Sequence, residues 1–519
     1  MAESGHLAAI LALALGGALL VPFFGRWARV AALLAMLAIL ALACRICLDF
    51  APAAPPTFDG GGFDSLGIRL RFAVDGFNLY LLLLTALLAP VVLACTWATA
   101  EGRGRLFASL LLALEAALLA TFLAQDLVVL FVAWEAVLIP MTLMILVFGG
   151  ERRRGAAVTF FVYTMAGSVL FLAAVIVLGA ESRAQTGRWS FDLAVLQGLQ
   201  LGPGRQSFVF WAIALACAIK SPLVPFHAWL PRAYGAASPA GTALMAGVLS
   251  KMGAYGFLRL AIPLAPDAAT AAAPVMVALA VTSILYGAVL ALTQRDLKRL
   301  VAYASLSHMG YIVLGAFGFT AVGVQGALFQ MLSHGVIVAG LFLVLGLAEQ
   351  RCGTAWLQLD GLATRAPRLA AVTMLFVLAS LALPLTSAFT AEFLVLLGAF
   401  TRGLASWRAA AGSGLLLAAI LASLGVVLGA AYMLRLARAL VFGDARGQAR
   451  LPDLSARELA ALAPLVLVIL AVGVRPAPWM AKVEPAVAAL VRIAPQSASP
   501  DPARAAPPPV TVAGADRAR

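Results

Sequence analysis

The chain has 519 residues, of which 63% are hydrophobic and only 11% are charged, and its mean hydropathy is +1.00. This composition excludes a water-soluble globular protein and favours a polytopic membrane protein in a lipid bilayer. The net charge of +13 does not indicate a nucleic-acid partner, because the arginines stand in short loops between apolar segments, where membrane topology places them.

Apolar segments long enough to cross a hydrocarbon layer of about 30 Å as helices recur along the chain. They predict an all-α polytopic membrane protein of about fourteen transmembrane helices. The predicted helices are 7–25, 28–49, 76–97, 106–124, 127–148, 157–180, 207–229, 239–261, 272–293, 297–318, 323–347, 369–400, 412–438 and 457–475. The first has no basic segment before it and no cleavage site after it, so we expect it to be retained.

The distribution of arginines predicts the topology. If Arg152, Arg153 and Arg154 face the cytoplasm, most of the other loop arginines do too, and both termini lie outside. The long loops 50–75 and 181–206, rich in Gly, Pro and Asp, are then also outside.

The end of the chain differs from the rest. Residues 478–493 predict a short interfacial segment, and residues 494–519 form an Ala/Pro-rich tail that we expect to be disordered. We therefore expect one transmembrane domain over residues 1–493.

Two predicted helices are interrupted by proline. Pro222 and Pro225 follow Lys220 in the seventh helix, and Pro384 precedes Glu392 in the twelfth. Matching interruptions are typical of transporters with inverted repeats, whose working groups lie beside the breaks. We expect two such repeats of five helices each, at about residues 106–261 and 272–438.

Lysine is rare, since only four of the 36 basic residues are lysines, and Lys220 and Lys251 stand within apolar stretches. Arginine stays protonated at any accessible pH, whereas a lysine moved out of water can release its proton reversibly. Genomic drift from lysine to arginine would explain the scarcity of lysine but not this placement. The placement indicates proton handling.

Six ionisable side chains fall well inside predicted helices: Glu135, Lys220, Lys251, His308, His334 and Glu392. An ionised group at the bilayer centre costs roughly 2.5 to 3.5 kcal/mol on insertion scales, so each needs a partner or a hydrated cavity. Any one of them could simply join two helices by a hydrogen bond. Together, with both signs of charge and histidine present, they favour an ion or proton path.

Several further residues are weighed beside these six. Lys298 and His308 lie roughly along one helix stripe, with His308 about 15 Å deeper, so Lys298 would connect the cytoplasmic edge to the path. Glu115 is a seventh buried candidate, or else it meets a neighbouring helix. Asp126 is predicted to cap a helix, and His227 to stabilise the broken one.

No phosphate-binding loop, metal-ligand cluster or nucleophile elbow is evident in the sequence. The single C-x-x-C pair, Cys44 and Cys47, has no second pair to complete a metal site. Any redox cofactor is therefore expected in another chain.

Four segments carry a family resemblance. These are WEAVLIPM at 134–141, IKSPLVPFHAWLP at 219–231, DLKRLVAYASLSHMG at 296–310 and LSHG at 332–335. They resemble the antiporter-like membrane subunits of respiratory complex I and the related Mrp cation/proton antiporters. The resemblance covers nearly the whole chain through residue 475.

Within this family, Leu383-Pro384 followed by Ala391-Glu392-Phe393 resembles the M type of NADH-quinone oxidoreductase subunit, in which the twelfth helix carries glutamate where the L and N types carry lysine. The family usually has an acidic residue and a histidine in the loop at 232–242, and this chain has neither.

The resemblance assigns roles to the buried residues. It implies that Glu135 and Lys220 form a coupled pair, that Lys251 is the central relay group and that Glu392 is the terminal proton-exchange group. His308 and His334 would be further relay positions.

It also implies a non-redox subunit of a proton-pumping NADH:quinone oxidoreductase of the bacterial inner membrane, beside L-type and N-type neighbours. FMN, iron–sulfur clusters and quinone would then be bound by partner subunits. The alternatives are an Mrp-type Na⁺/H⁺ antiporter subunit, an inorganic-carbon uptake subunit, a membrane hydrogenase subunit, or a scaffold whose polar residues only join helices.

Overall fold

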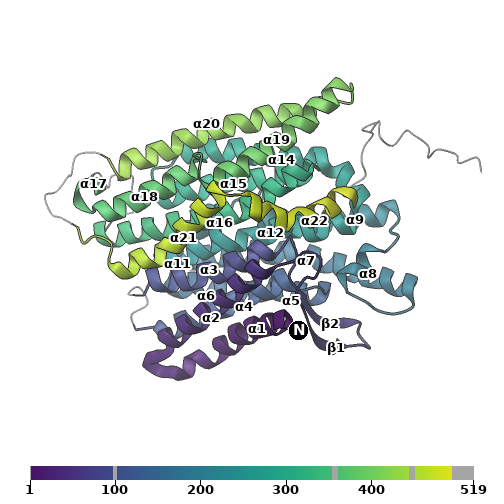
Figure 1. The fold of residues 1–519 in the computed structure, drawn as a ribbon, viewed down its shortest axis with the longest axis horizontal. Helices are drawn as coiled ribbons and strands as arrows, with labels where there is room; N and C mark the ends of the chain where they lie inside the picture. Colours follow the sequence, from purple (N-terminus) through teal and green to yellow (C-terminus); the bar gives the residue numbers. More distant parts are fainter. Residues whose placement is uncertain (1, 98–101, 354–360, 443–450, 494–519) are drawn as a thin grey trace, which may run out of the picture.

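A computed structural model describes residues 2–97, 102–353, 361–442 and 451–493. Each of the fourteen predicted segments contains helix, so the prediction of a helical membrane protein is confirmed (Figure 1). The long helices are α1 Ala2–Leu20, α2 Ala28–Asp49, α3 Leu79–Cys95, α4 Gly104–Leu123, α7 Arg153–Thr186, α9 Pro203–Lys220, α14 Pro266–Thr293, α15 Leu297–Phe317, α16 Ala321–Cys352, α18 Pro367–Ser380, α19 Ser387–Arg408, α20 Gly414–Leu440, α21 Ala456–Val474 and α22 Ala477–Ile493.

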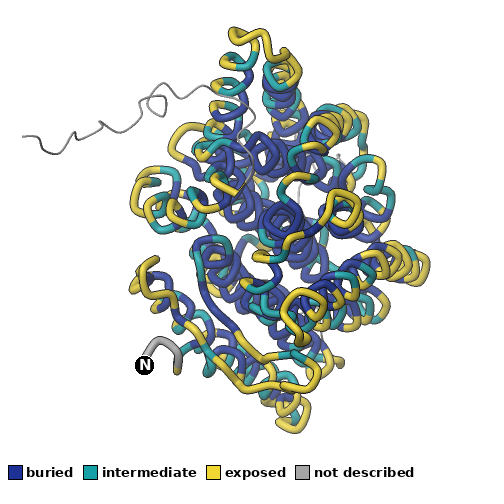
Figure 2. The backbone as a smooth tube through the Cα atoms, turned by 90° about the vertical axis from the view of Figure 1, so that its right-hand side faces the viewer, coloured by how far each residue is buried: buried dark blue, intermediate teal, exposed yellow. Residues whose placement is uncertain are grey.

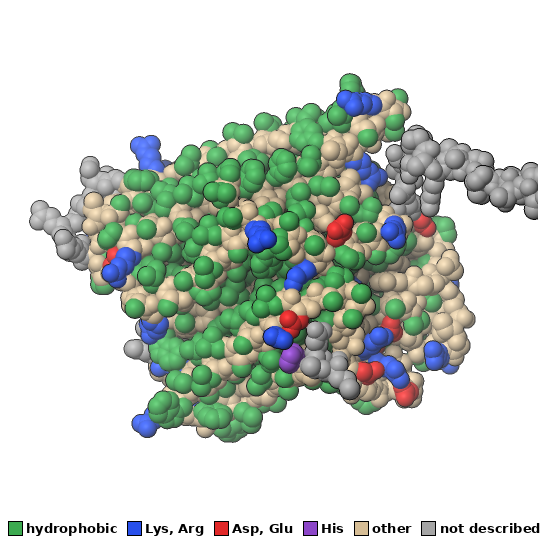
Figure 3. Space-filling view, viewed as in Figure 1, with side chains coloured by type: hydrophobic (Ala, Val, Ile, Leu, Met, Phe, Trp, Pro, Cys, Tyr) green, Lys and Arg blue, Asp and Glu red, His purple; other side chains and the backbone are tan. Residues whose placement is uncertain are grey.

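The number of membrane crossings stays a prediction. In the described residues, ten helical segments are long and apolar enough to span a membrane, with α1 and α2 counted as one segment. Leu79–Cys95 and Pro367–Ser380 are shorter apolar helices. Hydrophobic side chains cover most of the face shown in Figure 3, as expected for a surface that meets lipid.

Both predicted helix breaks are present. Helix α9 ends at Lys220, and the chain is not helical again until α10, Leu230–Ala236. In the second half, α18 ends at Ser380 and α19 begins at Ser387. Proline causes such breaks because it lacks a backbone N–H and its ring clashes with the preceding turn. The inverted-repeat relation of the two halves remains a prediction.

Two further predicted helices are divided. Residues 127–148 form α5, Leu127–Ala136, and α6, Leu138–Phe148. Residues 239–264 consist of α11 Pro239–Leu244, a π-helical turn η2 Met245–Leu249, α12 Ser250–Gly256, a second π-helical turn η3 Phe257–Ala261, and α13 Ile262–Leu264. The π-helical turns were not predicted. They enclose the turn that carries Lys251.

Helix α16 lies in the interior of the bundle. The most apolar 18-residue stretch of α16 is 100% buried. Figure 2 shows an inner set of buried helices surrounded by more exposed ones. Glycine permits this close packing, because a Cβ on Gly326 would lie 2.6 Å from the backbone nitrogen of Val395. The central helix therefore holds its side chains against several neighbours at once.

The predicted loop at 50–75 contains a β-hairpin that the all-α prediction did not include. Strand β1, Thr57–Phe63, pairs antiparallel with β2, Ile68–Ala73. Asp126 fixes this hairpin, since its Oδ2 accepts a hydrogen bond from the backbone N–H of Arg69 at 3.0 Å. Its Oδ1 accepts from the N–H groups of Val128 and Val129, so its predicted role as a helix cap is confirmed.

The remaining short helices connect the long ones. They are α8 Leu193–Gln197, in the predicted outer loop, and α17 Leu362–Arg365. Residues 478–493, predicted as an interfacial segment, belong to α22. The predicted disordered tail, residues 494–519, lies outside the described residues.

Candidate proton relay

Lys251 is fully buried, and its amino group contacts a histidine of the central helix. Its Nζ lies 2.8 Å from Nδ1 of His334 in α16 and 2.5 Å from the carbonyl oxygen of Ala246. Ala246 belongs to the π-helical turn η2, in which the usual carbonyl pairing of an α-helix is altered. The irregular turn thus supplies an acceptor for the buried amino group.

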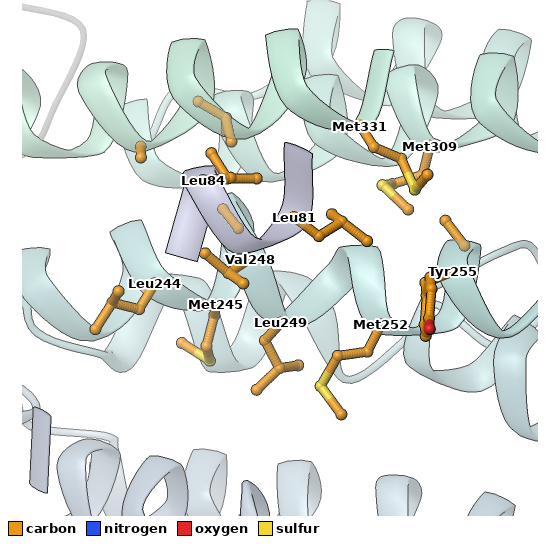
Figure 4. Close-up of a cluster of buried hydrophobic side chains, with 14 of the residues drawn as sticks. Leu81, Leu84, Leu244, Met245, Val248, Leu249, Met252, Tyr255, Met309 and Met331 are labelled. Carbon is orange, nitrogen blue, oxygen red and sulfur yellow. The ribbon is translucent and has the colours of Figure 1, made fainter. Parts of the chain in front are cut away.

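The surroundings of this turn are apolar. Val248, Leu249 and Met252 are within three residues of Lys251 in the sequence. Figure 4 shows their side chains in one apolar cluster with Leu81 and Leu84 of α3. A polar group within such packing is costly unless it is hydrogen-bonded. The few polar contacts of Lys251 therefore carry its stabilisation.

A second polar contact joins three helices. Nδ1 of His308 in α15 lies 2.9 Å from Oε1 of Glu392 in α19. Nε2 of Gln330 in α16 donates to the same carboxylate oxygen at 3.1 Å. Gln330 was not predicted as a site residue. Its signal in the sequence is an amide within an otherwise apolar run, four residues before His334 and hence on the same face of the helix.

The two contacts are adjacent. The ring centroids of His308 and His334 are 5.3 Å apart. A cavity of about 10 Å³ is lined by both histidines and Ser305, and another of about 10 Å³ by His308 and Glu392 with Tyr311 and Tyr432. Each has room for about one water molecule. Lys251, His334, His308 and Glu392 thus form a row, called here the central row.

Parts of the central row have unused hydrogen-bonding capacity. Nε2 of His308, Nε2 of His334 and Oγ of Ser305 are buried without a hydrogen-bond partner in the described structure. These atoms belong to side chains that line the shared cavity. The row is therefore polar where the cavity lies and can accommodate a transferable proton there.

Glu135 and Lys220 form a second group near two helix breaks. Lys220 is the last residue of α9, and its Nζ lies 5.3 Å from the ring centroid of Trp134, a cation–π contact. Neither Nζ of Lys220 nor the carboxylate oxygens of Glu135 have a hydrogen-bond partner among the described residues. Among the described residues no hydrogen bond or ion pair joins the two side chains.

A serine connects the two groups. Oγ of Ser221, next to Lys220, donates to the carbonyl oxygen of Ser250, next to Lys251, at 3.4 Å. The space between α9 and α12 is narrow, because a Cβ on Gly253 would lie 2.3 Å from the Cys217 carbonyl. The residue after Lys220 and the residue before Lys251 are therefore in direct contact.

Lys298 is outside the central row. Its Nζ makes an ion pair with Oε2 of Glu349 at 2.7 Å, which joins the start of α15 to the end of α16. His308 lies ten residues further along α15. The ion pair gives Lys298 a structural role, and its predicted contribution to the path stays a prediction.

Glu115 and His227 lie outside the central row. Glu115 is buried in α4, and its carboxylate oxygens have no partner within the described part of the chain. The ring of His227, in the break after α9, packs edge-on against Tyr286 at 5.2 Å. Among the described residues no group of three His, Cys, Asp or Glu side chains could hold a metal ion.

Comparison with known proteins identifies the family. Residues 124–411 match the family model described as NADH:quinone oxidoreductase/Mrp antiporter, transmembrane. Two proteins named NADH-quinone oxidoreductase subunit M are similar. The protein from Rickettsia prowazekii is 36% identical to this chain, in an alignment that covers 80% of this chain and 82% of the relative. The protein from Rhodobacter capsulatus is 38% identical, and the alignment covers 82% of this chain and 83% of the relative.

A solved structure agrees with this assignment. A chain of respiratory complex I from Thermus thermophilus is 34% identical, with a TM-score of 0.85 over 94% of this chain and 99% of that one. The chain therefore belongs to the NADH:quinone oxidoreductase/Mrp antiporter family of membrane subunits.

Proposed function

We propose that this chain is a proton-translocating membrane-arm subunit of an NADH:quinone oxidoreductase and that its protons pass through the central row. The observation that carries the proposal is the contact of Lys251 with His334, and of His308 with Glu392, on either side of one small cavity. Four titratable groups in succession inside an apolar bundle are costly to keep without a use.

The geometry of the row supports proton transfer. Nζ of Lys251 and Nδ1 of His334 are close enough to share one proton, but two positive charges at that distance repel each other. A proton that arrives at one group therefore favours release from the other. Nδ1 of His308 and Oε1 of Glu392, 2.9 Å apart, form the next contact along the row.

Glu135 and Lys220 would act as a switch on this row. A negatively charged carboxylate near a lysine stabilises the protonated lysine, so Glu135 would stabilise protonated Lys220. This stabilisation would be lost if the carboxylate were neutralised or moved away. The Ser221–Ser250 hydrogen bond links this pair to the turn that carries Lys251. Protonation of one group can thereby alter the next.

The partners follow from the relatives. Relatives named as subunits of NADH-quinone oxidoreductase support membrane-subunit partners in a bacterial inner membrane, and we propose L-type and N-type neighbours among them. The distribution of loop arginines supports both termini in the periplasm. FMN, iron–sulfur clusters and quinone would be bound by other subunits. The fold supports one transmembrane domain over residues 1–493 with inverted repeats at about 106–261 and 272–438.

An Mrp-type antiporter subunit is the second candidate, because the matched family model includes those proteins. Glutamate at position 392 favours the M type. Copurification of the chain with flavin and iron–sulfur subunits is expected for the first candidate, and their absence would favour the second.

The test is Lys220→Met in the intact complex, reconstituted in proteoliposomes. We expect normal assembly and a loss of proton pumping. The matched control is Lys482→Met, since Lys482 lies in α22 and donates to the backbone carbonyls of Cys47 and Leu48. Full pumping by an assembled Lys220→Met complex would refute the relay and favour a scaffold.

A further inference from the structure

A basic pocket lies at the end of the bundle where the 3₁₀ segment η1, Val21–Trp27, joins α1 to α2. Its volume is about 420 Å³, and four arginines line it together with the first turn of α4. The arginines are Arg26, Arg29, Arg103 and Arg105. Figure 1 shows α1 and α2 at one edge of the bundle, away from the helices of the central row.

Within the described part of the chain, no ion pair balances the charge of this pocket. Arg29 donates to the carbonyl oxygen of Trp97 at 2.6 Å and stacks on its ring, and Arg26 stacks on Trp27. Among the ion pairs of the described residues, none involves any of the four arginines. Guanidinium groups held by stacking keep donors available for an anionic ligand.

The backbone of the pocket also favours an anion. Helix α4 begins at Gly104, which lines the pocket, and no side chain caps its first turn. The unpaired N–H groups and the dipole at a helix N-terminus attract negative charge, phosphate in particular.

Exposed apolar side chains stand next to the pocket-lining residues in the sequence. Phe23 is 84% exposed and Trp27 is 58% exposed, and both belong to η1. Leu106, which lines the pocket, is 43% exposed. Exposed aromatic side chains next to arginines are typical of the boundary between membrane and water.

A separate apolar groove lies further along α1 and α4. It has a volume of about 720 Å³ and is lined by Leu15 and Leu19 of α1, by small residues of α4, among them Ala113 and Ala117, and by side chains of the β-hairpin, α5 and α6. Leu106, Ala113 and Ala117 lie on one face of α4, and Ala113 is about 10 Å from Leu106 along the axis. This is the direction in which acyl chains extend from a headgroup.

We propose that the arginine pocket binds the phosphate headgroup of an anionic glycerophospholipid whose acyl chain lies in the apolar groove lined by α1, α4, the β-hairpin, α5 and α6. Arginine binds phosphate oxygens in pairs, and clustered basic residues at the cytoplasmic surface attract anionic lipids. A free phosphate would use the pocket but not the groove. This proposal is independent of the proton relay.

The test places a photo-crosslinking amino acid, p-benzoylphenylalanine, at Leu106 of the chain in its complex, and membranes are irradiated. We expect adducts with anionic phospholipid well above its share of the membrane. The double variant Arg26→Gln, Arg103→Gln should reduce this enrichment by about fivefold for each arginine removed. The control is Arg154→Gln with Arg295→Gln, which removes the same charge from the same predicted side but outside the pocket.

The contrary outcomes are distinct. Adducts with a neighbouring protein subunit, or with lipids in their bulk proportion, would overturn the proposal. Loss of the enrichment with 10-fold excess inorganic phosphate over lipid would show a site for free anions instead. If the probe at Leu106 prevents assembly, Trp27, which is exposed, takes its place.

Discussion

Nζ of Lys251 and Nδ1 of His334 lie 2.8 Å apart in a fully buried setting, and they come from helices more than eighty residues apart in the chain. One proton shared between them satisfies both atoms, whereas two protons place like charges in contact. The pair is therefore suited to hold a proton briefly and pass it on.

His334→Gln should interrupt the row between Lys251 and His308. The amide can still accept a hydrogen bond but cannot take up a proton, so we expect proton pumping in proteoliposomes to fall by roughly 10²-fold. His227→Gln is the control, because its ring packs on Tyr286 outside the row. Equal pumping by both variants would show that His334 only fills space.

Glu392→Gln should separate charge from hydrogen bonding. The glutamine side chain can still accept a hydrogen bond from Gln330, but it cannot take up or release a proton. We expect an assembled complex whose pumping falls about tenfold or more, and Glu392→Asp should recover part of it. Pumping and NADH oxidation would be measured together. Wild-type rates in Glu392→Gln would mean that protons leave by another group.

Asp453 predicts a pH dependence of local stability outside the membrane. Its partial burial opposes ionisation, but the backbone N–H groups of Arg368, Leu369 and Leu454 and the charge of Arg368 outweigh burial and hold its pKa below the usual 3.8. The ionised form thus stabilises the start of α18. The stabilisation is complete at pH values above the pKa that Asp453 has in the unfolded chain. It is lost as the pH falls through the lower pKa that Asp453 has in the folded protein.

Asp453→Ala should therefore destabilise the first turn of α18 by roughly 1 kcal/mol at pH 7 and by much less near pH 3. Hydrogen exchange of residues 368–372 measures the difference. Asp64→Ala, at an exposed position of the hairpin, is the control. An identical effect of Asp453→Ala at both pH values would contradict the assigned charge interaction.

The sequence predicted much of the fold because membrane helices follow from long apolar runs. Both proline breaks, the helix cap at Asp126 and the burial of Lys251 and Glu392 were recognisable for local reasons. The π-helical turns beside Lys251 were not, because η2 and η3 differ from α-helix only in hydrogen bonding that tertiary packing selects.

The contacts that the site residues make with one another could not be predicted from the sequence. Nothing in the chain pattern places Gln330 between His308 and Glu392, since the contact requires three helices to meet. Helix periodicity correctly placed Lys298 and His308 on α15 but gave no sign of Glu349, which pairs with Lys298 from α16. Pairwise geometry of buried polar groups is set by packing rather than by periodicity.

The most direct test of the central row is Lys251→Met, a change that keeps the apolar stem and removes the proton-binding group. The measurement is the rate of proton pumping by the purified complex in proteoliposomes, relative to the amount of assembled complex. The row predicts normal assembly with pumping reduced by about 10²-fold or more. Pumping at the wild-type rate by an assembled Lys251→Met complex would contradict it.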